Sequence, residues 1–312
     1  MKIPLRPLLL LSVPLFLGAS ALPAEEKTVV QSINYPLHYF ATRLAAGTES
    51  FDLHYPVDPE GDPAFWKPED AALVAMQKAD LILLNGATYE KWMKTVSLPS
   101  SNQLDTSKSF AKRYLKTEGK AHRHGDGSVH SHAGTAFTTW IDFSQAAEQA
   151  SAIAGRFQTL QPGAVEKIEA NLVALKADLA ALDASMKAFG DTWGDEPLVA
   201  SHPIYQYLAR AYGLKIEAIE WEPEMILRDK DIAALKKILA HHPAKWMIWE
   251  DSPTAQNIAA LEAIGVKSVV FAPCANTPDE GDWLDVMKAN LKNLEALTQQ
   301  SVGSSPGAGA GR

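Results

Sequence analysis

The chain has 312 residues, of which 46% are apolar and 21% charged, so it can bury one or two substantial cores and is not an intrinsically disordered protein. Its 29 lysines and arginines stand against 37 aspartates and glutamates, which gives a formal net charge of −8 at pH 7. This balance lacks the basic excess that a phosphate backbone attracts, so nucleic acid is not an expected partner.

Residues 1–24 have the pattern of a secretory signal peptide. Lys2 and Arg6 precede the apolar run Leu8–Leu17, and small residues follow that run. The run is far short of the roughly 20 residues that cross a bilayer, which disfavours the alternative of a retained membrane anchor. We therefore expect export to the periplasm.

Cys274 is the only cysteine of the chain. An intrachain disulfide is therefore excluded, and no cysteine follows the signal peptide to carry a lipid. The sequence predicts a periplasmic protein that is not a lipoprotein.

Strands and helices alternate after the signal peptide, which is typical of a parallel sheet covered by helices. The expected elements are a strand at 27–33, a helix at 35–46, a strand at 50–57, a helix at 69–78 and a strand at 79–85. The last strand is continuously apolar, as a parallel strand buried on both faces must be. A long polar stretch from about 98 to 134 follows and is expected to be either functional or disordered.

Two helices are expected next, at 144–159 and after Pro162-Gly163. The apolar residues of the second recur at spacings of three and four: Val165, Ile168, Leu172, Leu175, Leu179, Leu182 and Met186. This spacing predicts a helix of about 36 Å with one narrow apolar seam. The seam suits either a coiled-coil dimer or packing along the rest of the protein, and a run of only three heptads favours the second.

The alternation returns in a second block. Its expected strands are at 198–201, 216–221, 246–250 and 268–273, and its expected helices are at 204–212, 229–240, 254–264 and 282–296. The predicted fold class is α/β, with two lobes that each contain a parallel sheet flanked by helices and are joined by a long rigid helix.

The predicted domain organisation follows from these blocks. The boundaries are 25–143 for the first lobe with a histidine-rich loop at 116–134, 144–190 for the helical segment, 191–300 for the second lobe and 301–312 for a disordered tail.

Ligands of open parallel sheets bind beyond the carboxyl ends of the strands, so the residues at those ends are candidates for a site. They are His54, Asn85, Ser201-His202, Trp221-Glu222, Glu250-Asp251 and Pro273-Cys274. Histidines and carboxylates among them indicate a metal ion.

Four histidines fall within eleven residues of the polar stretch: His122, His124, His130 and His132. Neutral imidazoles bind zinc and similar ions, and the neighbouring glycines allow a loop to fold around one. The pattern favours metal contact over the alternative of a solvated polar loop.

Two strand-end residues are the strongest candidates outside that loop. His202 ends one strand, and Glu250 ends the apolar strand 246–249, where a carboxylate is costly unless it is paired or bound to a cation. The candidate metal ligands are His130, His132, His202 and Glu250, with His122, His124, His38 and His54 as weaker candidates.

Several short motifs occur in an order and spacing typical of one known family. They are Asn34-Tyr-Pro-Leu-His38, Asp62-Pro-Ala-Phe-Trp66, Ala79-Asp-Leu-Ile-Leu-Leu-Asn-Gly86, the histidine loop, Trp140-Ile-Asp142, Ser201-His202 and Asp282-Trp-Leu. The chain resembles the periplasmic proteins that deliver zinc or manganese to ABC importers, the ZnuA-like or cluster A-I group. The resemblance implies two α/β lobes joined by a long helix, a metal ion between them and an ABC permease as partner.

The resemblance also implies four ligand positions, which correspond here to Ala64, Thr138, His202 and Ala272. Only His202 is retained, and alanine coordinates nothing. We therefore predict a relocated site in which His130 and His132 replace the first-lobe ligands and Glu250 supplies the acidic one.

The predicted function is capture of a divalent transition metal ion and its delivery to an ABC importer, by a monomer that is not an enzyme. A histidine-rich set with one carboxylate favours Zn²⁺, with Mn²⁺ or another divalent transition metal as the alternative. Two further functions are considered. A metal-dependent hydrolase is suggested by His122-Arg-His124-Gly-Asp126, although Gly127 occupies the last ligand position of that signature, and a periplasmic metal buffer or chaperone is equally compatible with the sequence.

Overall fold

The computed structural model describes residues 26–59, 61–117, 121–123, 129–131 and 134–302. The predicted signal peptide, 1–24, lies outside these residues. Helix α8, Trp283–Val302, extends beyond the expected end at 296 and includes the first two residues of the predicted tail. The rest of that tail, 303–312, also lies outside the described residues. No helix of the described residues is long and apolar enough to cross a membrane.

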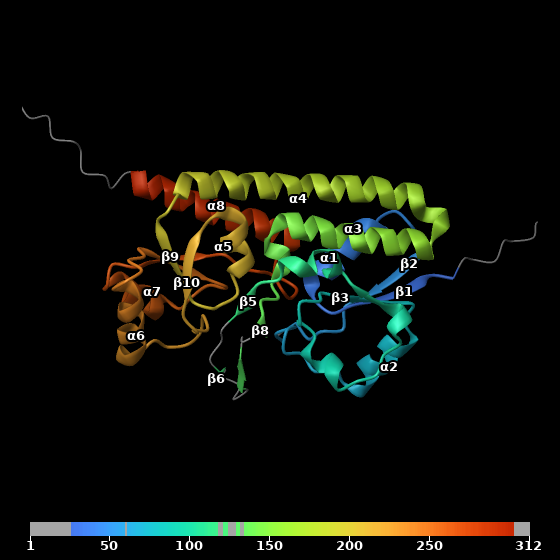
Figure 1. Cartoon of the computed structure of the whole chain (residues 1–312), viewed down its shortest axis with the longest axis horizontal. Helices are drawn as coiled ribbons and strands as arrows, with labels where there is room; N and C mark the ends of the chain where they lie inside the picture. The colour runs from blue at the N-terminus through green and yellow to red at the C-terminus, as the bar shows by residue number, and fades with distance from the viewer. Residues whose placement is uncertain (1–25, 60, 118–120, 124–128, 132–133, 303–312) are drawn as a thin grey trace, which may run out of the picture.

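Two four-stranded parallel sheets form the two lobes, which confirms the predicted fold class (Figure 1). The first sheet has the order β2-β1-β3-β4, with strands Phe51–His54, Thr28–Ser32, Leu81–Leu84 and Gln103–Asp105. The second has the order β10-β9-β11-β12, with strands Lys215–Ala218, Pro197–Ala200, Trp246–Trp249 and Lys267–Val270.

The helices connect these strands and cover the sheets. The first lobe contains α1, Tyr35–Ala45, and α2, Asp70–Lys78. The second contains α5, Gln206–Tyr212, α6, Asp229–Leu239, and α7, Ala255–Glu262.

The polar stretch from about 98 to 134, expected to be either functional or disordered, contains short elements. Ser100–Asn102 and Lys108–Arg113 in this stretch are 3₁₀-helical, as are Lys91–Lys94, Thr139–Ile141 and Pro162–Ala164 outside it. Two small antiparallel pairs join β5, Lys116–Thr117, to β8, Gly134–Thr135, and β6, Ala121–Arg123, to β7, Val129–Ser131.

Helix α4, Val165–Trp193, spans both lobes and lies beside α3, Phe143–Leu160, and α8 (Figure 1). Its seam residues Ile168, Leu175, Leu179, Leu182 and Met186 are buried by the protein's own helices. The prediction that the seam packs along the rest of the protein is confirmed.

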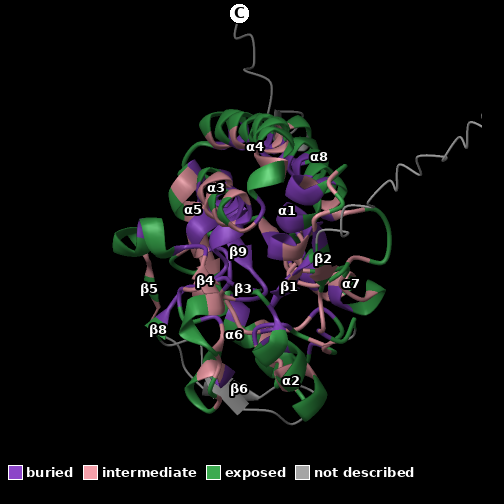
Figure 2. Ribbon diagram, turned by 90° about the vertical axis from the view of Figure 1, so that its right-hand side faces the viewer, coloured by how far each residue is buried: buried purple, intermediate pink, exposed green. Residues whose placement is uncertain are grey.

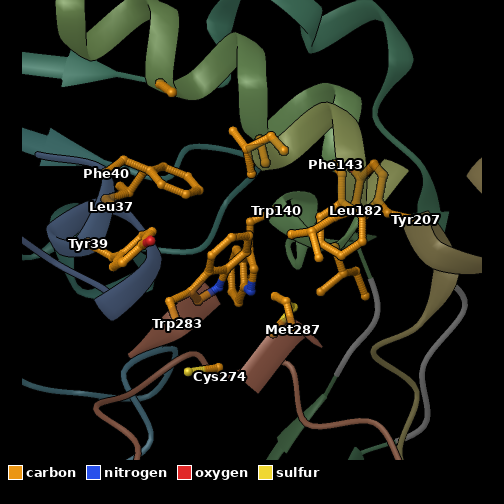
Figure 3. Packing of buried hydrophobic residues seen from close by; sticks show 14 of the residues in the cluster. Leu37, Tyr39, Phe40, Trp140, Phe143, Leu182, Tyr207, Cys274, Trp283 and Met287 are labelled. Atoms are coloured by element: carbon orange, nitrogen blue, oxygen red, sulfur yellow. The ribbon is translucent and has the colours of Figure 1, made fainter. Parts of the chain in front are cut away.

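One hydrophobic core runs from the first sheet into the second, and Figure 2 shows buried segments, in purple, on α1, α3 and the strands. At its centre the Trp283 ring contacts the edge of Phe40 at 5.2 Å between ring centroids and of Phe143 at 6.1 Å (Figure 3). These rings come from α8, α1 and α3. Because edge-to-face aromatic pairs add to the burial of apolar area, they fix the two lobes against each other.

Candidate metal centre

A cleft of about 620 Å³ lies between the lobes, beside the carboxyl ends of the strands. The first lobe contributes Asp62, Tyr89 and Thr138 to its wall, and the second contributes His202 and Glu250. This is where a ligand of open parallel sheets is expected.

Three side chains of the second lobe converge on this cleft. His202, Glu222 and Glu250 each place one ligand atom within 4.8 Å of the others. The Nδ1 atom of His202 lies 3.8 Å from Oε1 of Glu222 and 3.7 Å from Oε1 of Glu250. We call these three residues the acidic triad.

The order of the strands explains why the acidic triad forms. His202 follows β9, Glu222 follows β10 and Glu250 follows β11, and these strands are adjacent in the order β10-β9-β11. Because the strands are parallel, their carboxyl ends lie at one edge of the sheet.

Backbone hydrogen bonds hold the turns that carry the triad. The N–H of Ser201 donates to the carbonyl of Ile248 at 2.8 Å, and the N–H of Trp221 donates to the carbonyl of Ser201 at 2.6 Å. The second bond folds the chain after β10 back toward the end of β9. It brings the neighbouring Glu222 to His202, which is only 5% exposed.

The carboxylates of the triad lie close together, each about a quarter exposed at the cleft. Burial raises the pKa of Glu250 well above its usual value, and the nearby charges of Glu222 and Asp62 raise it further. Burial, followed by the charge of Glu250, likewise raises the pKa of Tyr205. A cation bound here would relieve this repulsion and favour the ionised carboxylates.

The separations within the triad fit a zinc-sized ion. Zinc binds imidazole nitrogen at about 2.0–2.1 Å and carboxylate oxygen at about 2.0–2.2 Å, so two donors of a tetrahedral site lie roughly 3.4 Å apart. The observed 3.7 and 3.8 Å require a contraction of only a few tenths of an ångström. The triad therefore offers three donors, and a fourth must come from another group.

The structure brings two of the predicted ligands, His202 and Glu250, together in the cleft. The prediction did not include Glu222 as a ligand. The signal for it was available, since Glu222 follows the strand predicted at 216–221, but nothing in the sequence shows which strands are neighbours.

Two weaker candidates, His38 and His54, do not belong to the acidic triad. The His38 ring on α1 stacks on Tyr55 at 5.7 Å, and burial, followed by the charge of His54, lowers its pKa. His54, at the end of β2, is exposed and pairs with Asp52 at 3.0 Å. Neither histidine lines the cleft among the described residues.

The histidine-rich loop is described only in part. His122 and His130 are backbone partners in the antiparallel pair β6-β7, whereas His124 and His132 lie outside the described residues. The structure describes none of the four side chains, so their part in metal binding stays a prediction.

The three positions at which the family resemblance implied ligands line the same cleft as His202. They are occupied by Ala64, Thr138 and Ala272. The side chains at these positions thus face the same space as the acidic triad, but the two alanines provide no donor atom.

Comparisons with known proteins bear on the family and the fold of the chain. The profile of the family described as "ZnuA: Zinc-uptake complex component A periplasmic" matches residues 29–297. The zinc-binding lipoprotein AdcA of Streptococcus pneumoniae serotype 4 (strain ATCC BAA-334 / TIGR4) is 26% identical over 290 residues, which cover 89% of this chain and 57% of AdcA. The chain thus spans little more than half of the length of that relative.

A relative of similar length is the high-affinity zinc uptake system protein ZnuA of Bacillus subtilis (strain 168). It is 24% identical over 281 residues, which cover 86% of this chain and 87% of that protein. Among solved structures, the metal-dependent lipoprotein YcdH from Bacillus subtilis has a TM-score of 0.72 at 21% identity and covers 88% of this chain and 98% of its own. Zn(II)-bound AdcA from Streptococcus pneumoniae has a TM-score of 0.71 at 20% identity and covers 90% of this chain and 59% of its own.

Proposed function

We propose that this chain, which belongs to the ZnuA family of periplasmic zinc-uptake components, captures a zinc ion between its lobes and delivers it to the permease of an ABC importer. The observation that carries the proposal is the acidic triad, in which one buried imidazole and two carboxylates converge on the cleft. Such a donor set suits a divalent transition metal ion.

Zinc is proposed as the cargo because the acidic triad provides three donors at separations suited to zinc. The names of AdcA and of the Bacillus subtilis protein refer to zinc, which supports the same choice. We propose that the loop supplies the fourth donor through His130 or His132, so that two nitrogen donors balance the two carboxylates. Manganese prefers more oxygen donors and is the competing cargo if the loop does not take part.

We further propose that the mature protein is a monomer of the periplasm without a lipid anchor. The relatives AdcA and YcdH are named lipoproteins, whereas the single cysteine of this chain, Cys274, is buried in the second lobe. The apolar seam of α4 is covered within the chain, which supports the monomer. Membership of a family of transport components supports binding rather than catalysis as the role.

The test of the function is a titration of the metal-free protein with zinc and, separately, with manganese. We expect one tightly bound zinc per chain and a melting temperature that rises with zinc concentration, because a ligand selective for the native state stabilises it. No thermal shift with zinc, manganese, copper or nickel would overturn the proposal.

Delivery to an importer is tested separately from binding. Zinc-loaded protein should stimulate both ATP hydrolysis and zinc uptake by vesicles that contain the cognate permease and ATPase, and the metal-free protein should not. A protein that binds zinc but stimulates neither is a metal buffer or chaperone, and the importer part of the proposal is then wrong.

A further inference from the structure

One side chain of the second lobe is hydrogen-bonded to three consecutive described residues of the first. Asn276 lies between β12 and α8, and its Nδ2 donates to the carbonyl oxygens of Asp58 at 2.8 Å, Pro59 at 2.9 Å and Gly61 at 2.7 Å. The three acceptors belong to the connection from β2 to α2, more than 200 residues away in the chain. We call this set of contacts the Asn276 clasp.

The oxygen atom of the same side-chain amide also forms hydrogen bonds. Its Oδ1 accepts hydrogen bonds from the Tyr55 hydroxyl at 2.7 Å and from the N–H of Thr277 at 2.8 Å. A side-chain amide is needed here, because it offers two donor hydrogens and an acceptor at once. A carboxylate of the same shape has no hydrogen to donate to the three carbonyls.

The chain just before Asn276 passes from one lobe to the other. The Asn290 side chain of α8 exchanges hydrogen bonds with the backbone of Ala272 at 2.9 and 2.7 Å, which attaches that end to the second lobe. Further on, the carbonyl of Pro273 accepts from the Trp140 indole at 2.8 Å and that of Ala275 from the N–H of Tyr35 at 2.9 Å. Asn276 is thus the last and most heavily bonded residue of a crossing between the lobes.

The Asn276 clasp and the acidic triad line the same cleft. The residue after the last clasped carbonyl is Asp62, whose Oδ1 accepts from the N–H of Ala64 at 2.8 Å and whose charge contributes to the raised pKa of Glu250. Asp62, Ala64 and Asn276 all line the cleft. The clasp therefore fixes the distance between the first-lobe wall of the cleft and the donors of the second lobe.

We propose that Asn276 is a positioning residue that holds the first-lobe wall against the acidic triad and so sets how slowly the ion leaves the cleft. The inference rests on the proposed function, since it assumes an ion in that cleft. The clasp can open without unfolding either sheet, because its hydrogen bonds join two connections and no strand. Loss of the clasp should increase the dissociation rate of the ion more than it changes the association rate, because long-range electrostatic attraction governs association.

The test compares Asn276→Ala and Asn276→Asp with Asn293→Ala. Asn293 is a matched control, because its exposed side chain donates one hydrogen bond, to the carbonyl of Val270 at 3.0 Å, within the second lobe. The rate of zinc release is measured by stopped flow with a chelator in excess, and the association rate is measured separately. We expect release to be about tenfold faster in Asn276→Ala, faster again in Asn276→Asp and unchanged in Asn293→Ala, with association altered less than threefold.

A second measurement on the metal-free protein separates failure of this inference from failure of the proposed function. The amides of Gly61, Ala64 and Phe65 donate to Asp58 or Asp62, and their hydrogen exchange reports on the clasped connection. In Asn276→Ala their exchange should accelerate about tenfold while the amides of α4 keep their protection. Unchanged exchange at these amides, an equal loss of protection throughout the chain, or wild-type zinc release would each overturn the inference.

Discussion

The Nδ1 atom of His202 lies 3.7 Å from Oε1 of Glu250, although the two residues are 48 positions apart in the chain. They meet because β9 and β11 are parallel neighbours, so that the residues following them lie at the same edge of the second sheet. A half-buried carboxylate beside a buried imidazole, with a second half-buried carboxylate from the chain after β10, is costly to keep ionised without a cation. The arrangement is therefore best explained as a binding site for a cation.

Replacement of His202 by alanine should weaken zinc binding more than replacement of any other single histidine. Its ring is buried and fixed at a strand end, so its loss removes a preorganised ligand, and we expect a decrease in affinity of about 100-fold or more. Competition with a chromophoric chelator measures it. His38→Ala and His54→Ala are the controls, which should stay within about threefold of the wild-type affinity. Wild-type affinity in His202→Ala would show that the ion binds elsewhere.

Zinc binding should release a proton from the acidic triad wherever Glu250 is still protonated in the metal-free protein. Burial and the charge of Glu222 raise the pKa of Glu250, so this carboxyl keeps its proton to a higher pH than an ordinary glutamate does, and the metal must displace it. Affinity should accordingly fall as the pH is lowered. Calorimetry in buffers of different ionisation enthalpy measures the number of protons released when zinc binds. We expect Glu250→Gln to release about one proton fewer than the wild type. The control is Glu262→Gln, at an exposed residue, which should release as many protons as the wild type. Equal proton release in all three proteins would contradict the assignment of Glu250 as a ligand.

Removal of residues 122–132 distinguishes two roles of the histidine-rich loop. If His130 or His132 is a ligand, the tight zinc site is lost, because His202, Glu222 and Glu250 provide three donors where zinc prefers four. If the loop only collects ions for a site elsewhere, tight binding persists and only weak sites disappear. We expect loss of the tight site. Equilibrium titration of the shortened protein decides between the roles, and a variant with the four loop histidines replaced by serine controls for the deletion itself.

Glu90 should make the folded state less stable as the pH rises. Its Oε1 accepts from the N–H of Asn85 at 2.5 Å, and burial raises its pKa from 4.5 to about 8. The folded state therefore binds a proton that the unfolded chain gives up above about pH 4.5, so stability declines between about pH 4.5 and 8. Glu90→Gln should remove on the order of 3 kcal/mol of this decline, measured by urea unfolding across that range. If the free energy of unfolding depended on pH in the same way in the variant and the wild type, the prediction would be wrong.

The alternation of strands and helices was predictable because most strands are short apolar runs and most helices have an apolar periodicity. Strand β4 was missed, since Gln103–Asp105 is a half-buried edge strand with a single apolar residue, Leu104. Strand β10 was predicted too long. It ends at Ala218, and the chain then turns so that the N–H of Trp221 reaches the carbonyl of Ser201.

The site was less predictable than the fold for a related reason. Burial of the strand 246–249 identified Glu250, and the position after a strand identified His202, both of which are local features. Glu222 becomes a neighbour of His202 only through the order of the strands, and Asn276 reaches the first lobe across more than 200 residues of chain. Neither relationship leaves a pattern in the sequence.

The most direct test of the account is anomalous diffraction at the zinc absorption edge from crystals of the zinc-loaded protein. The account predicts one strong anomalous peak in the cleft between the lobes, within about 2.2 Å of His202 Nδ1 and of a carboxylate oxygen from each of Glu222 and Glu250. A strong peak at another position, with the acidic triad free of metal, would contradict it.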